Sequence, residues 1–217
     1  MIKVTICGIS SPAEAREVIA AGADALGFHI ELEHAKSPCP VETVAQIIAG
    51  LPPYCASVLV TTLSRLQEVA VLVTTTRANT MQYQGDSSLG ELIAIREKFP
   101  YLKIYRVIHV FDDHAIGEAK QYEGVVDAVL LDTANKDTGQ RGGTGKSHDW
   151  NISRRVVEST SVPIILAGGL NPDNVVQAIT TVHPFAVDVE SGVSNLDGSK
   201  NLEKVKLFIA RAKGVLL

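Results

Sequence analysis

Two residues of the chain have side chains that could move protons and stand where apolar, strand-like segments end. Cys7 ends the segment that begins at Lys3, and Asp132 ends the one that begins at Val126. A thiol acts as a base once its pKa falls from about 8.5, and a carboxylic acid can donate a proton once burial raises its pKa. Such a pair facing across one site would suit proton transfer on a bound sugar. Taken singly, Cys7 is more simply a small buried apolar residue and Asp132 a loop or helix cap.

Two glycine loops follow two consecutive apolar strands near the end of the chain. Gly168-Gly169 follows residues 162–166, and Ser191-Gly192 follows Ala186–Val189. In an eight-stranded α/β barrel, the loops after the last two strands commonly bind phosphate through backbone N–H groups. One glycine pair alone would indicate an ordinary turn. Two pairs in consecutive units favour a phosphate site, and Asp188 lies beside it at the end of the last strand.

A third glycine-rich loop follows Asp132 and contains Gly143, Thr144 and Gly145. It superficially resembles a nucleotide P-loop, but Gln140 stands where the G-x-x-x-x-G-K-[ST] pattern requires its first glycine. The loop is therefore predicted to close over a phosphorylated ligand rather than to bind a nucleotide.

The composition excludes several classes of protein. A net charge of −4 with scattered basic residues argues against nucleic-acid binding. No apolar run is long enough to span a membrane, and the N-terminus lacks a signal-peptide pattern, which predicts a cytoplasmic protein. The three cysteines, an odd number, show no metal-ligand spacing and favour reduced thiols. No metal or cofactor is predicted, and the expected partner is a small phosphorylated sugar.

Strand-like and helix-like patterns alternate along the whole chain without a linker. About eight β-then-α units in 217 residues predict an α/β fold, a (β/α)8 TIM barrel forming a single domain over residues 1–217. The alternative is a doubly wound open sheet. Residues 7–10, Cys-Gly-Ile-Ser, lack the G-x-G-x-x-G turn of a dinucleotide-binding sheet. The predicted helices are Pro12–Ala21, Val41–Ala49, Ser64–Val73, Ser88–Lys98, His114–Tyr122, Trp150–Glu158, one capped by Asn171 with Pro172 in its first position, and Leu202–Val215. The predicted strands before the last two are Lys3–Cys7, Ala25–Ile30, Ala56–Val60, Thr80–Gln82, Lys103–His109 and Val126–Asp132.

Six motifs lie in order over nearly the whole chain. They are Ile6-Cys7-Gly8-Ile9, Gly22-Ala23-Asp24-Ala25-Leu26-Gly27-Phe28, Leu130-Leu131-Asp132-Thr133, residues 142–150, Leu166-Ala167-Gly168-Gly169-Leu170-Asn171-Pro172 and residues 187–193. Together these motifs resemble the phosphoribosylanthranilate isomerase family. This resemblance implies a TIM barrel without cofactor or metal, which performs an Amadori rearrangement of an aminoaldose phosphate in tryptophan biosynthesis. It implies that Cys7 removes the C2 proton and Asp132 protonates the furanose oxygen. The glycine loops would hold phosphate, and Asp188 would sit near the ribose hydroxyls.

The departures from the family pattern gather on the anthranilate side. Cys39 stands where the family has an Arg for the anthranilate carboxylate, and Gln84 replaces a His. A thiol cannot replace the bidentate contact of a guanidinium. Lys36, Gln84 and Arg106 are the candidates for the altered aryl pocket, Lys36 as a point charge on a longer reach.

Three readings follow from this pattern. The first is a working isomerase with a rebuilt aryl pocket, which the presence of both Cys7 and Asp132 favours. The second is a family member that isomerises another phosphorylated sugar. The third is a non-catalytic phosphosugar-binding protein. The sequence does not decide between a monomer and a homodimer.

Overall fold

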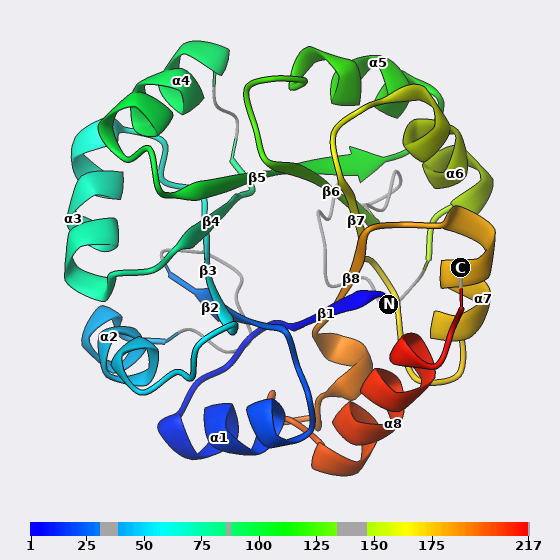
Figure 1. Cartoon of the computed structure of the whole chain (residues 1–217), viewed down its shortest axis with the longest axis horizontal. Helices are drawn as coiled ribbons and strands as arrows, with labels where there is room; N and C mark the ends of the chain where they lie inside the picture. The colour runs from blue at the N-terminus through cyan, green and yellow to red at the C-terminus, as the bar shows by residue number, and fades with distance from the viewer. Residues whose placement is uncertain (31–38, 86–87, 134–146, 217) are drawn as a thin grey trace.

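The computed structural model describes residues 1–30, 39–85, 88–133 and 147–216. Its strands form a closed parallel barrel in the order β1 to β8, so the predicted TIM barrel is confirmed. Figure 1 looks down the barrel and shows the helices as an outer ring, with β1 beside β8 where the ring closes. The strands are β1 (Lys3–Ile6), β2 (Ala25–His29), β3 (Ala56–Thr61), β4 (Thr80–Tyr83), β5 (Lys103–Val110), β6 (Ala128–Thr133), β7 (Ile164–Leu166) and β8 (Ala186–Val189).

Helices follow the strands, and short polar signals begin several of them. Ser11 caps the first helix by accepting a hydrogen bond from the N–H of Glu14, and Ser88 forms a reciprocal capping box with Glu91. The helices are α1 (Pro12–Ala20), α2 (Val41–Ala49), α3 (Leu66–Thr76), α4 (Leu89–Lys98), α5 (His114–Gln121), α6 (Trp150–Ser159), α7 (Val175–Val182) and α8 (Leu202–Lys213), with a short 3-10 helix η1 (Ser191–Val193). In the part of the chain that the structure describes, none of them is long and apolar enough to cross a membrane.

Side chains of each strand alternate between the barrel interior and the helix layer. On β5, Ile104 and Ile108 belong to the main core, which includes residues of the helices. Val107 instead packs inside the barrel with Leu130 of β6 and Ile165 of β7. This alternation decides which polar residues at the strand ends can face a shared site.

Two helices differ most from their predicted boundaries. The helix predicted at Ser64–Val73 is α3, Leu66–Thr76, because its last threonines stay helical: the Thr76 hydroxyl donates to the Leu72 carbonyl oxygen at 2.7 Å. Asn171 does not cap α7. Its side chain accepts hydrogen bonds from the N–H groups of Asp173 and Asn174, which closes a separate turn, and Asn174 is the residue before the helix.

Candidate active site

The carboxyl ends of the strands bring Cys7, Asp132 and Asp188 into one electrostatically coupled site. Cys7, directly after β1, belongs to a cluster inside the barrel with Val58 and Val60, and its N–H bonds the Val189 carbonyl oxygen at 2.9 Å. Asp188 on β8 raises the pKa of Cys7, and Asp132 on β6 raises the pKa of Asp188. The two predicted proton-transfer residues therefore share the interior of the barrel mouth.

Cys7 is a buried thiol in an acidic neighbourhood. Its Sγ lies 3.4 Å from Nε2 of His29, which is also buried. Burial raises the pKa of Cys7 well above its usual value, and the charges of Asp188 and Glu190 raise it further, while Lys200 and the Gly8 N–H oppose them. Cys7 is thus a neutral thiol at neutral pH, and it needs a proton acceptor to act as a base.

Asp132 has the properties of a general acid near neutral pH. Burial raises the pKa of Asp132 to about 6, Glu190 adds to the rise, and a hydrogen bond from the Thr133 N–H to Oδ1 at 2.7 Å opposes it. A pKa close to the working pH lets one carboxyl both hold and release a proton.

Asp188 is a buried carboxyl whose charge the fold disfavours. Burial, then Asp132 and Glu190, raise the pKa of Asp188 to about 8, against the opposing charge of Lys200. Its Oδ1 is buried and has no hydrogen-bond partner among the described residues. An unpartnered buried polar atom at a barrel mouth is suited to contact a substrate hydroxyl.

We expect Asp188→Asn to stabilise the protein at pH 8 and to have a smaller effect at pH 5. The folded-state pKa is raised, so the group's stability contribution is complete below the unfolded pKa of about 3.9 and is lost as pH rises towards about 8. The asparagine amide of the variant carries no charge, so this pH-dependent loss of stability disappears. Thermal unfolding of Asp188→Asn at pH 8 should therefore occur about 2 °C higher than that of the wild type, or more. The control is Asp173→Asn, at an exposed residue that ion-pairs with Arg211 at 2.7 Å. A gain that does not grow with pH would contradict this account of Asp188.

The end of β6 and the loops after β7 and β8 approach one another closely at two glycines. Gly168 and Gly169 both have positive φ, +81° and +68°, and their N–H groups donate no hydrogen bond to another described residue. A Cβ on Gly168 would collide with Thr133, and a Cβ on Gly192 would collide with the Leu170 carbonyl oxygen. Such close-packed glycine backbone leaves amide groups that can surround an anion.

His148 joins the two ends of the segment that follows β6. Its Nδ1 lies 2.9 Å from the Thr133 hydroxyl, and its Nε2 lies 2.5 Å from the Ser153 hydroxyl on α6. Burial lowers the pKa of His148 to about 4, so the ring is neutral at pH 7 and links Thr133 to Ser153 through hydrogen bonds. The predicted phosphate residues Gly143, Thr144 and Gly145 lie outside the described residues.

Comparison with known proteins decides the family. The model of the N-(5'-phosphoribosyl)anthranilate (PRA) isomerase family matches residues 4–211. The chain belongs to this family. It is 38% identical over 213 residues to N-(5'-phosphoribosyl)anthranilate isomerase 2 of Methanosarcina mazei, covering 98% of this chain and 94% of that protein. It is equally identical to the isomerase of Methanocella arvoryzae, covering 98% of this chain and 99% of that protein. The PRA isomerase structure from Thermotoga maritima matches with a TM-score of 0.88 and 31% identity, over 99% of this chain and 100% of that chain.

Membership of the PRA isomerase family bears out the resemblance and the isomerase class predicted from the sequence. The family has the same closed barrel, and its enzymes belong to tryptophan biosynthesis. Cys7, Asp132, Asp188 and the two glycine loops lie at the carboxyl ends of β1, β6, β7 and β8. Their roles in this chain are part of the proposal below.

Arg106, one of the three residues predicted for the aryl pocket, does not face the barrel interior. It shares the strand face of Ile104 and Ile108, its Nε donates to the Tyr122 hydroxyl at 3.0 Å, and its Nη1 donates to the Gly85 carbonyl oxygen. Two tyrosine rings flank the guanidinium. Arg106 therefore supports the packing between barrel and helices, and strand alternation could have predicted this.

The other aryl-side positions divide between described and undescribed residues. Gln84 directly follows β4, and its N–H bonds the Thr61 carbonyl oxygen at 3.0 Å. Lys36 lies outside the described residues. Cys39, at the position where the resemblance implies an Arg, is buried, and its Sγ lies 3.7 Å from the Ser10 carbonyl oxygen. The Cys39 thiol therefore contacts the backbone of Ser10 and does not supply a positive charge.

Three residues of the candidate site were not predicted from the sequence. His29 contacts Cys7, and Glu190 and Lys200 both influence the pKa of Cys7 and Asp188. His29 follows Gly27 by two residues on one strand, so alternation was a usable signal for it. Lys200 comes from the segment before α8, and no local pattern indicates its approach to the barrel mouth.

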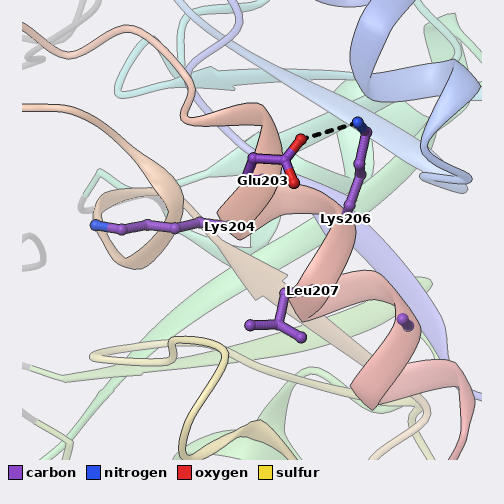
Figure 2. A pocket seen from close by; sticks show the side chains of 5 residues that line it. Glu203, Lys204, Lys206 and Leu207 are labelled. Carbon is purple, nitrogen blue, oxygen red and sulfur yellow. Dashed lines mark hydrogen bonds and ion pairs between the residues drawn. The ribbon is translucent and has the colours of Figure 1, made fainter.

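An open depression on α8 is separate from this site. Figure 2 shows it on the helix surface, where Glu203 and Lys206 form an ion pair at 3.0 Å. Its lining residues are Glu203, Lys204, Lys206, Leu207 and Ala210, all from that helix. With no second element lining it, the depression lacks the concave walls of a small-molecule site.

Proposed function

We propose that this chain is a PRA isomerase that converts N-(5'-phosphoribosyl)anthranilate into 1-(o-carboxyphenylamino)-1-deoxyribulose 5-phosphate without a cofactor. The observation that carries the proposal is the pairing of Cys7 and Asp132 inside one barrel mouth, beside bare glycine backbone. A family structure at 29% identity and a TM-score of 0.85 holds the reduced form of that product. The glycine loops would hold the phosphate, so that the sugar is oriented between acid and base.

The proposed reaction proceeds by proton transfers and needs no external oxidant or reductant. Asp132 gives its proton to the furanose ring oxygen, the C1–O bond breaks, and the nitrogen lone pair forms a Schiff base at C1. Cys7, as thiolate, takes the proton from C2. The electrons of that C–H bond form the C1–C2 double bond of an enolamine, and the second pair of the C1–N double bond returns to nitrogen. Tautomerisation then moves the hydroxyl proton to C1 and yields the ketose. Asp132 regains a proton from water, and water receives the proton that was removed to form the Cys7 thiolate, so the protein returns to its starting state.

A second candidate is the same rearrangement on another N-substituted phosphoribosylamine. The observation that favours it is Cys39, buried and uncharged where the resemblance implies an Arg. The test is kcat/KM for PRA beside kcat/KM for phosphoribosylamines that carry an alkyl or an uncarboxylated phenyl group. Preference for PRA supports the first function, whereas preference for an uncarboxylated amine supports the second.

We expect Gly169→Asp to weaken binding of phosphorylated ligands about tenfold or more, because it adds bulk and a like charge beside the phosphate. The measurement is titration calorimetry with reduced 1-(o-carboxyphenylamino)-1-deoxyribulose 5-phosphate. Gly124→Asp is the matched control, since Gly124 also has positive φ, +76°, and a Cβ there would meet nothing within 4 Å. Equal affinity of wild type and Gly169→Asp would exclude the phosphate site after β7.

The organisation of the protein beyond the site stays a prediction. One related structure is described as monomers generated from the dimeric isomerase of Thermotoga maritima, at 29% identity. We therefore propose a single domain over residues 1–217, acting as a monomer or homodimer, in the cytoplasm. Light scattering of the purified chain measures its oligomeric state.

A further inference from the structure

His29 lies directly against the thiol of Cys7 inside the barrel. The two atoms that meet, Nε2 of His29 and Sγ of Cys7, are 3.4 Å apart, and both residues are almost fully buried. Gly27 makes this approach possible, because a Cβ at that position would lie only 2.5 Å from Sγ. At the end of β2, the thiol of Cys7 and the imidazole of His29 therefore lie in contact in the buried interior of the barrel.

The opposite nitrogen of the same ring faces a carboxylate. Nδ1 of His29 lies 3.7 Å from Oε1 of Glu190, and it has no hydrogen-bond partner among the described residues. A negative charge on that side favours the tautomer that carries its proton on Nδ1, which leaves a lone pair on Nε2. The lone pair then faces the S–H group of Cys7.

Two of the three charged groups that act on Cys7 oppose its ionisation. The titratable groups that act on Cys7 are Asp188 and Glu190 at the end of β8 and Lys200 before α8. Burial and the two acids keep the thiol protonated, so a bare thiolate forms in solution only at high pH. A neutral imidazole within reach is the arrangement by which proteins activate a thiol.

We propose that His29 is a positioning residue that accepts the Cys7 proton on Nε2, with Glu190 orienting its ring, so that the thiolate forms inside the site. This inference rests on the proposed function, in which Cys7 is the base. The S–H bond breaks, an Nε2–H bond forms, and no electrons are exchanged with another group. After Cys7 takes the C2 proton, the imidazolium releases its proton to water, which balances the proton that Asp132 regains.

The first test compares kcat/KM for PRA in wild type and His29→Gln between pH 6.5 and 9. Proton transfer within the Cys7–His29 pair does not depend on pH, whereas ionisation of a lone thiol increases about tenfold per pH unit below its pKa. Asp132, Asp188, Glu190 and Lys200 are present in both proteins, so the ratio of the two kcat/KM values isolates His29. We expect the kcat/KM of the wild type to exceed that of His29→Gln about 10²-fold at pH 7, and this ratio to fall about tenfold for each unit that the pH rises.

A ratio that stays constant with pH would overturn the inference, because a purely structural defect lowers the rate equally at every pH. A ratio near one would overturn it as well. His29→Asn is the second variant, with circular dichroism as the check of folding, and it should show the same falling ratio. His114→Gln is the matched control, since His114 is exposed on α5 and pairs with Asp112.

The second test needs no substrate, so it separates this inference from the proposed function. Nitrogen-15 NMR of the histidine-labelled protein reports which ring nitrogen of His29 carries the proton, and the signal absent from His29→Gln assigns the residue. We expect Nδ1 protonated and Nε2 bare at neutral pH. A proton on Nε2 would overturn the inference even if PRA is turned over. A bare Nε2 in a chain that does not turn over PRA would count against the proposed function alone.

Discussion

Cys7→Ser is expected to lower kcat for PRA about 10⁴-fold, at the upper end of the range for one acid–base residue. The serine hydroxyl has nearly the size of the thiol, so it fits beside Gly27 and His29. It is a far weaker acid than a thiol, and a neutral imidazole cannot convert it into a base of useful population. The measurement is steady-state turnover, together with the Kd of reduced 1-(o-carboxyphenylamino)-1-deoxyribulose 5-phosphate, which should change little.

The control for this experiment is Cys55→Ser. Cys55 precedes β3 at the opposite end of the strands from the site and is half-buried, so its replacement should leave kcat unchanged. Undiminished turnover in Cys7→Ser would remove Cys7 from the mechanism. Loss of both turnover and ligand binding would show that Cys7 supports the shape of the site and is not its base.

Asp132→Asn is expected to lower kcat/KM for PRA about 10³-fold, because the amide cannot protonate the ring oxygen. The amide oxygen can still accept the hydrogen bond from the Thr133 N–H, which wild-type Asp132 accepts at 2.7 Å, so the loop geometry should be kept. In the wild type, Asp132 must be protonated to act, and its pKa is raised to about 6. The wild-type kcat/KM should therefore decrease as pH rises through about 6, and this decrease should be absent from the variant.

Asp197→Asn is the control for the acid, since Asp197 is exposed and accepts hydrogen bonds from the N–H and hydroxyl groups of Ser199 in its own turn. A decrease in kcat/KM above pH 6 that persists in Asp132→Asn would assign the acid to another group. Asp188 would then be the next candidate, because it faces the same interior and also has a raised pKa.

The barrel could be predicted from the sequence because each unit carries its own local signal. Ser11-Pro12 and Ser88 mark helix starts through side-chain caps, and the structure places α1 and α4 directly after them. The local signals predicted the wrong helix boundaries where side chains form hydrogen bonds with the backbone. The threonines at the end of α3 extend that helix, and Asn171 closes a turn of its own before α7. Both outcomes depend on hydrogen bonds that residue preferences do not determine.

The site was predictable only in part, because its residues meet through the closure of the barrel. Cys7 and Asp132 stood out by chemical type at strand ends. Arg106 was also a candidate from the sequence, but it lies in the middle of β5, and its position in the alternation places it on the helix side, against Tyr122. His29 was not predicted because its partner lies 22 residues away, on the neighbouring strand. The meeting of Gly192 with the Leu170 carbonyl oxygen likewise joins two loops and has no local signal.

The central claim is that this barrel isomerises PRA with Cys7 as its base, and fluorescence-monitored turnover of PRA tests it most directly. The purified chain and Cys7→Ser are mixed with PRA, and the loss of substrate fluorescence gives kcat/KM for each. We predict a wild-type value of about 10⁴ M⁻¹s⁻¹ or more, in the ordinary range of enzymes, and a value about 10⁴-fold lower in Cys7→Ser. A wild-type protein that binds the reduced product but leaves the fluorescence of PRA unchanged would contradict the claim.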